Sequence, residues 1–305
     1  MLLKKSIVAC LGAIVWLACA HATPGEVSTQ AARMTITNIT DDRGQVVKLI
    51  APADRIITLS PHATELVFAA GGGPQIKATV NASDFPEAAR ALPRIGDGLL
   101  PDPERLLRWR PDLLIGWQVS QFANLNALNI STFLSAPKTL QDVPNTIEKL
   151  GVLLGTSEIA QLRAASLRNT LMHLKQHPHP TPPVRVFLQV GETSEYSLNG
   201  SHLLSQVIEI CGGINVFASA TAIAPKISPE SVLAQRPELI LLGRVGAPAR
   251  PVPDAMAQQY WSRLNLPAAQ AGHVYVMDSD VLYRPGPRLI EAAEAICSMT
   301  QQARK

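Results

Sequence analysis

The hydrophobic residues of this chain are concentrated in short runs separated by amphipathic stretches. Uninterrupted runs occur at residues 113–115 and 239–242, and mainly apolar runs at 56–59, 184–190 and 273–277. Continuous apolar runs bounded by turn residues are typical of strands that are buried on both faces of a sheet. In the stretches between them, apolar residues recur at the three- and four-residue spacing of an amphipathic helix. This alternation of strand and helix predicts mostly parallel sheets with helices on both faces.

Two local patterns mark the beginning of the folded part. Residues 34–38 and 45–49 are strand-like and flank the turn sequence Asp41-Asp42-Arg43-Gly44, so we expect a β-hairpin. Farther on, Ser60 stands before Pro61, a pair typical of a helix N-terminus. The glycines at 71–73 follow that helix and are interpreted as its stop.

One pattern occurs twice. Residues 103–115 and 229–241 have Pro, Glu, Leu, Arg, Pro and Leu at matching positions. Each segment predicts a short helix beginning at Pro, ended by Arg-Pro because the residue before proline disfavours helical geometry, and followed by a buried strand. We interpret the recurrence as one unit used once in each of two lobes. Chance is the alternative, because helix, proline and strand often follow one another.

A long amphipathic segment separates the two copies. Residues 141–154 and 157–176 are predicted to be helical, and the second has an apolar stripe on one face formed by Ala160, Ala164, Leu167, Leu171 and Leu174. We therefore predict an α/β fold with two Rossmann-like lobes and mostly parallel sheets, joined by one long interdomain helix. The expected boundaries are 34–138 for the N-terminal lobe, 139–180 for the linking helices and 181–305 for the C-terminal lobe.

The first residues predict export. Two lysines at 4 and 5 precede an uncharged run over 6–20, which is too short to span a bilayer comfortably. Small residues then favour cleavage after Ala20 or Ala22, so we expect a signal peptide at 1–22 and a flexible leader at 23–33. A lipoprotein site at Cys19 is less favoured, because Trp16 occupies a position where a leucine-like residue is usual.

Composition and charge narrow the function classes. Hydrophobic residues make up 47% and charged residues 17% of the 305 residues, as in soluble globular proteins. Loss of two lysines with the signal peptide reduces 27 basic residues to 25 against 24 acidic ones, so the formal charge falls from +3 to +1. Bulk charge therefore indicates no nucleic-acid partner. Only Cys211 and Cys297 remain, and in an exported protein they most simply form one disulfide, with two buried thiols as the alternative.

The sequence contains none of the common catalytic motifs and no convincing metal-binding motif. No Gly-x-Ser-x-Gly elbow, His-Glu-x-x-His pair or Walker sequence occurs, so we do not expect an enzyme. His173, His177 and His179 are close in sequence, but intervening prolines prevent a shared helical face, and an exposed helix end is favoured over a metal site. We expect neither a resident cofactor nor a metal.

Several motifs together resemble a known family, the periplasmic substrate-binding proteins of the helical-backbone type that feed ATP-driven importers. The resemblance extends from Arg55 to the C-terminus and is strongest to members that bind cobalamin (vitamin B12). It is carried by residues 55–61, Ala63-Thr64-Glu65-Leu66, Ser83-Asp84-Phe85-Pro86, Arg110-Pro111-Asp112-Leu113, Gly116-Trp117, Cys211-Gly212-Gly213 and Pro287-Arg288. It implies a monomer in the periplasm, a corrinoid ligand between the lobes, and the permease and ATPase of an ABC importer as partners. It also places the family's disulfide on Cys211 and Cys297.

The resemblance also implies site residues. The expected ligand contacts are Trp117, Tyr196, Asp280, Tyr283 and Arg284. Three positions depart from the cobalamin-binding pattern, because Ala82, Asp97 and Ala224 stand where large aromatic residues are usual. The departures leave room for a bulkier corrinoid or a different ligand, so haem or a ferric siderophore is the alternative. His62 at a helix start is a candidate haem ligand, although it has no partner tyrosine at a matched position.

The repeated unit has a functional interpretation as well. Glu104 and Glu230 occupy the same place in its two copies, on the first turn of a helix. A carboxylate there is favoured by the helix dipole, which is a purely structural explanation. The resemblance instead implies that these glutamates dock the two subunits of the transporter from one rim of the protein. A two-fold transporter and a pseudo-two-fold partner fit each other.

Overall fold

The computed structural model describes residues 37–125, 128–176, 181–191 and 195–304. The expected signal peptide and leader lie outside the described residues, as do His177 and His179. Within the described part, no helix is long and apolar enough to cross a membrane.

The predicted hairpin is present. Strands β1 (Thr37–Thr40) and β2 (Val46–Leu49) pair antiparallel, with Thr37 opposite Leu49. The Asp41 carboxylate closes the turn by accepting hydrogen bonds from the backbone N–H groups of Arg43 at 2.9 Å and Gln45 at 3.1 Å. Short acidic side chains that bond the backbone two residues on are a common cause of such turns.

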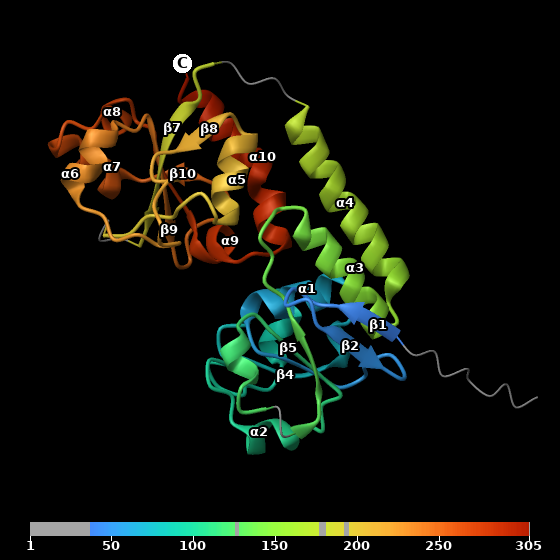
Figure 1. Ribbon diagram of the computed structural model, residues 1–305. Helices are drawn as coiled ribbons and strands as arrows, with labels where there is room; N and C mark the ends of the chain where they lie inside the picture. The colour runs from blue at the N-terminus through green and yellow to red at the C-terminus, as the bar shows by residue number, and fades with distance from the viewer. Residues whose placement is uncertain (1–36, 126–127, 177–180, 192–194, 305) are drawn as a thin grey trace, which may run out of the picture. The chain divides into compact units, whose positions relative to one another are not determined.

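The N-terminal lobe contains a fully parallel sheet in the order β4-β3-β5-β6. Figure 1 labels β4 and β5 of this sheet, together with α1 and α2 of the same lobe. Side chains alternate between its faces, so Ile56 and Ile115 enter one hydrophobic cluster while Ile57 and Leu114 enter another. Ser60 caps α1 as predicted, accepting a hydrogen bond from the Ala63 N–H. The elements of this lobe are β3 (Ile56–Thr58), α1 (Pro61–Ala69), β4 (Ile76–Thr79), α2 (Pro103–Leu107), β5 (Leu113–Gly116) and β6 (Ser131–Leu134).

The C-terminal lobe has a second sheet in the order β10-β11-β9-β7-β8, parallel except for the edge strand β10. Its outer face is anchored by Trp261, which is fully buried and packs edge-to-face on Phe187 with ring centroids 5.7 Å apart. The strands are β7 (Val184–Val190), β8 (Gly213–Asn215), β9 (Leu239–Arg244), β10 (Val252–Pro253) and β11 (Val274–Asp278). The helices are α5 (Leu203–Ile210), α6 (Pro229–Gln235), α7 (Ala255–Arg263), α8 (Pro267–Gln270), α9 (Ser279–Tyr283) and α10 (Pro287–Gln302).

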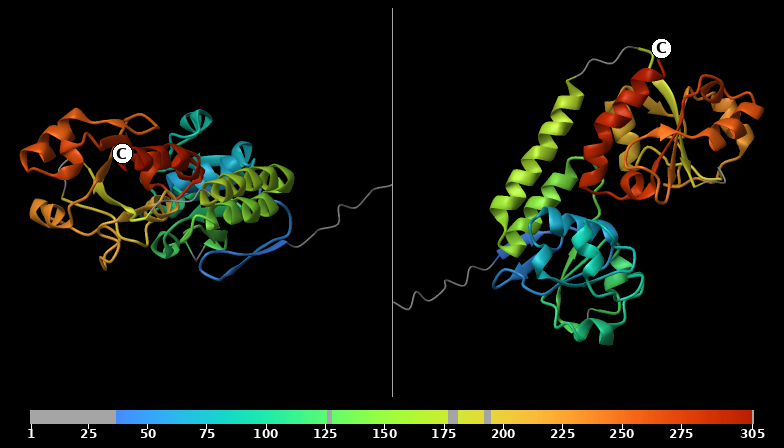
Figure 2. Two further views of the ribbon diagram at one scale, coloured as in Figure 1. Left: turned by 90° about the horizontal axis from the view of Figure 1, so that it is seen from above. Right: turned by 180° about the vertical axis from the view of Figure 1, so that it is seen from behind.

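Two helices stand between the sheets in the chain, α3 (Asp142–Leu154) and α4 (Ser157–Lys175), and α4 is the longest described helix. The predicted apolar stripe of α4 is buried. The two helices approach closely at Gly151, where a Cβ atom would come within 2.3 Å of the Ala160 Cβ. Helix α4 also runs beside α10 (Figure 2) and is joined to it by an ion pair between Arg163 and Glu291. The two linking helices thus fall within one residue of the predicted ranges 141–154 and 157–176, and α4 is the longer of the two.

The predicted disulfide is confirmed. Cys211, directly after α5, is bonded to Cys297 on α10, and 86 positions separate them in the sequence. The bond therefore links two helices that pack together inside the C-terminal lobe.

The two copies of the repeated unit form equivalent hydrogen bonds. Arg55, just before β3, donates from Nε to the Trp109 carbonyl at 2.9 Å after α2. Arg185 in β7 donates from Nε to the Gln235 carbonyl at 2.8 Å at the end of α6. Trp109 and Gln235 occupy matching positions of the repeat, so each lobe caps its short helix with an arginine from the neighbouring strand.

The two short helices also end with the same backbone geometry. Arg110 and Arg236, the residues before the two prolines, have left-handed backbones with φ of 46° and 45°. Helical geometry is disfavoured before proline, which accounts for the chain leaving the helix there. Such agreement argues that the recurrence in the sequence is structural rather than accidental.

Candidate functional site

The expected ligand residues stand after the carboxyl ends of parallel strands, where α/β sheets place their ligands. Trp117 follows β5, and Asp280, Tyr283 and Arg284 lie on or directly after α9, which follows β11. Tyr196 lies beyond the end of β7. The Trp117 and Tyr196 side chains remain 40% and 43% exposed, so both offer aromatic surface to a ligand.

Arg284 is the centre of a polar network. Its Nη1 donates to Glu65 Oε1 at 3.1 Å and to Asp84 Oδ1 at 2.9 Å. Its Nη2 donates to Asp280 Oδ2 at 2.6 Å and to the Ala82 carbonyl at 3.1 Å. A guanidinium has five N–H groups. These bonds occupy both terminal nitrogens, so a ligand needs the Nε–H or must displace a present acceptor.

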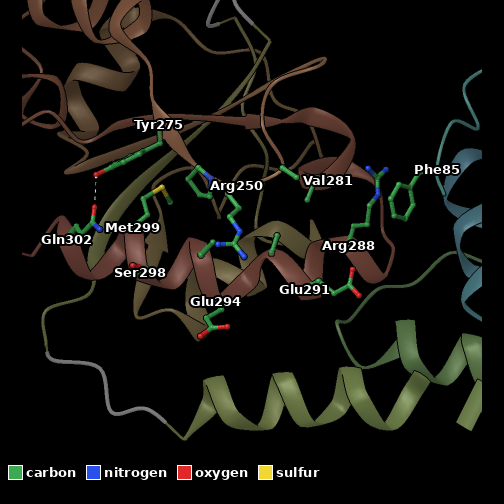
Figure 3. Close-up of a pocket in the computed structure, with 14 residues that line it drawn as sticks. Phe85, Arg250, Tyr275, Val281, Arg288, Glu291, Glu294, Ser298, Met299 and Gln302 are labelled. Carbon is green, nitrogen blue, oxygen red and sulfur yellow. Dashed lines mark hydrogen bonds between the residues drawn. The ribbon is translucent and has the colours of Figure 1, made fainter. Parts of the chain in front are cut away.

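Glu65 joins the two lobes within this network. Its side chain is only 1% exposed, and it accepts two hydrogen bonds from Arg288 on α10, from Nε at 2.9 Å and from Nη2 at 2.6 Å. The Phe85 ring covers the Arg288 guanidinium at 4.4 Å (Figure 3). Since a buried charge is tolerated only when paired, Glu65 depends on the arginines of the other lobe.

Two carboxyl groups around Arg284 are perturbed in opposite directions. Burial raises the pKa of Asp84, but the hydrogen bond and charge of Arg284, with the charge of Arg288, outweigh it and bring that pKa below its usual value. The pKa of Asp280 is raised, chiefly by burial and despite the positive charge of Arg284. Asp84 is therefore the firmer anionic partner of Arg284.

The His62 ring packs against the Trp117 ring and is held by two hydrogen bonds. Its Nε2 hydrogen bonds to the Ser135 carbonyl at 3.0 Å and its Nδ1 to Ser60 Oγ at 3.2 Å, and its ring meets the Trp117 ring edge-on at 6.3 Å. Burial, helped by the charge of Arg284 and opposed by the hydrogen bond to the Ser135 carbonyl, lowers the pKa of His62 to about 4. With both nitrogens engaged, His62 is not positioned to offer a free nitrogen to a haem iron.

Tyr283 is occupied within its own lobe. Its hydroxyl donates to the Gln189 carbonyl at 2.9 Å and accepts from the Gly243 N–H at 2.8 Å. Burial raises the pKa of Tyr283 and lowers that of neighbouring His202 to about 4. The hydroxyl thus ties the ends of β7 and β9 to the segment that carries Arg284.

Tyr196 lies apart from the network. It forms isolated β-bridges with Val190 and Lys226, and its carbonyl accepts a hydrogen bond from the Val190 N–H at 2.9 Å. Among the described residues, no hydrogen bond or ring contact joins it to Arg284. Of the five expected ligand residues, Asp280 and Arg284 are joined directly by a hydrogen bond, whereas Trp117 contacts His62 and the Tyr283 hydroxyl bonds Gln189 and Gly243.

Sequence reasoning assigned no role to Glu65, Asp84 or Arg288, although all three stand in the quoted motifs. The available signal was local. Glu65 is a charged residue between Thr64 and Leu66 on a helix whose neighbouring positions are buried, and such a residue needs a partner.

A groove of about 710 Å³ runs along α10 from Phe85 and Arg288 to Tyr275 and Gln302 (Figure 3). None of the five expected ligand residues lines it. Its lining mixes acidic, basic and apolar side chains without a converging set of donors. We therefore keep the strand ends as the candidate ligand site. In the part of the chain that the structure describes, no cluster of three or more His, Cys, Asp or Glu could hold a metal.

Both expected docking glutamates are exposed. Glu104 lies on the first turn of α2 and Glu230 on the first turn of α6. A hydrogen bond with Ser228 lowers the pKa of Glu230, so its charge is retained in mildly acidic conditions. Neither carboxylate forms an ion pair with another described residue.

Comparisons with known proteins agree with this arrangement. The family of periplasmic binding proteins matches residues 56–281. The vitamin B12-binding protein of Vibrio cholerae serotype O1 is 32% identical over 258 residues, which cover 83% of this chain and 91% of that protein. The vitamin B12-binding protein of Photorhabdus laumondii is 32% identical over 253 residues, covering 82% and 88%.

Solved structures give the same result. The vitamin B12 binding protein BtuF of Vibrio cholerae superposes with a TM-score of 0.74 at 32% identity, covering 83% of this chain and 99% of that one. The periplasmic haem-binding protein HutB of Vibrio cholerae superposes with a TM-score of 0.68 at 22% identity, covering 80% and 98%, and indicates a shared fold alone. On the sequence match and the two-sheet fold together, this chain belongs to the periplasmic binding protein family.

Proposed function

We propose that this protein captures a cobalamin-like corrinoid between its two lobes in the periplasm and delivers it to an ABC importer. The observation that carries the proposal is the 32% identity to the vitamin B12-binding protein of Vibrio cholerae over 83% of the chain. A binding role rather than catalysis agrees with the family. The expected signal peptide supports the location.

The proposed contacts follow from the chemistry of a corrin. Trp117 and Tyr196 supply aromatic surface for its flat apolar faces, and Arg284 with Asp280 supplies a donor and an acceptor for its amide side chains. Ala82, Asp97 and Ala224 are small or polar where aromatic rings are usual in cobalamin-binding relatives. Because aromatic rings bury about 150–250 Å² each, their absence favours a ligand with bulk of its own at these positions.

The first experiment is calorimetry of the mature protein with cyanocobalamin, cobinamide and haemin. We expect saturable binding of a corrinoid and none of haemin. Arg284→Ala should weaken corrinoid binding by about 1.5–3 kcal/mol, the value of a hydrogen bond to a charged group. Arg263→Ala, which removes an exposed arginine from α7, is the matched control. Binding of haemin alone would overturn the corrinoid assignment.

The alternative ligands are a ferric siderophore and haem, for which His62 is the candidate axial ligand. Both His62 nitrogens already have hydrogen-bond partners, so neither is free to coordinate an iron. This observation favours the corrinoid over haem.

For delivery, we propose that Glu104 and Glu230 dock the two transporter subunits. Glu104→Lys and Glu230→Lys should each reduce transport and complex formation while ligand affinity and melting temperature stay near those of the unchanged protein. Glu158→Lys is the matched control, because Glu158 is an exposed first-turn glutamate of α4 outside the repeat. Loss of ligand binding with docking intact would assign the two glutamates to the ligand site instead.

A further inference from the structure

Next to Glu104, the N-terminal lobe has a pocket that the ligand site does not use. It has a volume of about 400 Å³ and is lined by Arg94, Ile95, Arg105, Arg108 and Trp109. We call it the basic pocket. We propose that the basic pocket binds a phosphate group of an anionic molecule. This inference goes beyond the proposed function and stands without it, because none of the expected ligand residues lines the pocket.

The repeated unit provides an internal comparison. Positions that build the unit are retained, and Leu106 and its counterpart Val232 are both fully buried. Positions that line the basic pocket differ between the copies. The pairs are Arg105 with Ser231, Arg108 with Ala234, and Trp109 with Gln235.

This contrast separates fold from binding. The C-terminal lobe builds the same helix, turn and strand without two arginines and a tryptophan at these places. The backbone capping of the short helix is also made in both lobes, by Arg55 and Arg185. The fold of the unit therefore does not require Arg105, Arg108 or Trp109, and we infer that a ligand accounts for these three side chains.

The positive charge in the pocket is only partly neutralised. Arg94 is fixed by hydrogen bonds from Nη1 to the carbonyls of Val80 at 3.0 Å and Ser83 at 2.8 Å, neither of which carries charge. Arg105 has Asp102 at 3.7 Å, and both side chains are largely exposed to solvent, which weakens that pair. For Arg108, no described residue forms an ion pair.

Trp109 adds an aromatic wall to the basic pocket. It is half-buried, and among the described residues its indole N–H has no hydrogen-bond partner. The ring offers a flat wall against which a guanidinium can stack, and the N–H offers one more donor.

Phosphate is the anion that this set matches best. Guanidinium groups pair with phosphate oxygens through two parallel hydrogen bonds, and a phosphate has more oxygens to share among three arginines than a carboxylate has. The formal charge of the chain without its first 22 residues is only +1, since 25 basic residues face 24 acidic ones. General electrostatic attraction is therefore weak, and binding should depend on the pocket. The phosphate could belong to a lipid headgroup or to a soluble compound.

The test variant transfers the C-terminal copy into the N-terminal one by combining Arg105→Ser, Arg108→Ala and Trp109→Gln. It should fold, because Gln235 already occupies the position matching Trp109 and accepts a further bond from Arg185 at 2.9 Å. The control combines Lys175→Ala with Arg263→Ser and removes the same charge from exposed helix positions elsewhere. Circular dichroism and melting temperature establish that both variants are folded.

Two probes distinguish the sources. In the first, the mature protein is sedimented with phosphatidylcholine vesicles containing or lacking 30 mol% phosphatidylglycerol. In the second, inorganic phosphate is titrated against chloride at equal ionic strength while backbone amide shifts are followed by NMR. We expect the unchanged protein and the control to bind in at least one arm, and the triple variant to bind about tenfold more weakly.

Each outcome has a meaning. Vesicle binding that depends on phosphatidylglycerol and on the three pocket residues supports a lipid headgroup. Amide shifts confined to residues near 94–109, without vesicle binding, support a soluble phosphate compound. Equal losses in the triple variant and the control would show unspecific charge attraction and overturn the proposal. Absence of binding of the unchanged protein in both arms would overturn it too.

Discussion

Asp84 and a ligand should compete for the same guanidinium. Asp84 Oδ1 accepts a hydrogen bond from Arg284 Nη1 at 2.9 Å, while Glu65 and Asp280 hold other parts of that side chain. Replacing Asp84→Ala therefore frees a donor without releasing the arginine. If Arg284 contacts the corrinoid, as proposed, affinity should rise rather than fall.

The size of the gain follows from exposure. A hydrogen bond between charged partners contributes about 1.5–3 kcal/mol when well shielded. Arg284 is 14% exposed, but the Asp84 side chain is 50% exposed, so solvent screens much of the interaction. Exposed ion pairs contribute about 0.2–1 kcal/mol, and we expect Asp84→Ala to tighten binding by about 0.5–1 kcal/mol. This corresponds to roughly a two- to fivefold lower Kd.

The assay is a double-mutant cycle measured by calorimetry with cyanocobalamin. The four proteins are the unchanged chain, Asp84→Ala, Arg284→Ala and the double variant. The gain from Asp84→Ala should vanish when Arg284 is already absent, because its cause is the release of that side chain. Asp84→Asn, which retains the size of the side chain but removes the charge, should give a smaller gain in the same direction.

One result would refute the reasoning. If Asp84→Ala weakens binding equally with and without Arg284, then Asp84 itself contacts the ligand or holds the lobes in their binding arrangement. Arg284 would then have no part in the effect. Unequal weakening would likewise contradict competition, because release of Arg284 can only assist a ligand that uses it.

Three further predictions concern stability, each measured by urea unfolding. Joint replacement of Cys211 and Cys297 by serine should lower the free energy of unfolding by about 3–5 kcal/mol, given the separation of 86 positions, and an unchanged midpoint would contradict it. Glu65→Gln should cost about 3 kcal/mol by leaving the buried fork of Arg288 with a neutral partner, and a loss below about 1 kcal/mol would show the charge to be dispensable. The pKa of His62 is lowered from 6.5 to about 4, so its neutral form stabilises the fold at pH 7, and up to about 3 kcal/mol is lost as the pH falls through that window. His62→Gln should flatten this dependence, whereas equal slopes would exclude the histidine.

The sequence by itself determined the architecture. Buried strands, capped helices and the hairpin at Asp41 depend on spacing and caps within a few residues, so local patterns are sufficient to predict them. The two copies of the repeat indicated two lobes, and two remaining cysteines in an exported chain indicated the disulfide. Both linking helices were also predicted, at 141–154 and 157–176, and Gly155 with φ of 71° ends α3 and lets α4 return beside it.

Only the tertiary structure decided which residues of the candidate site form hydrogen bonds and ion pairs with one another. The contacts of Arg284 with Glu65 and Asp84 join residues 219 and 200 positions apart in the chain. A local sequence pattern cannot predict such a contact, because the contact forms only when α1 and α10 of different lobes pack together. The same holds for Tyr283, whose hydroxyl is used by two strand ends rather than left for a ligand. Local spacing sets which elements form, but partners of buried polar groups depend on packing between elements far apart in sequence, since only there must each desolvated charge find its counterpart.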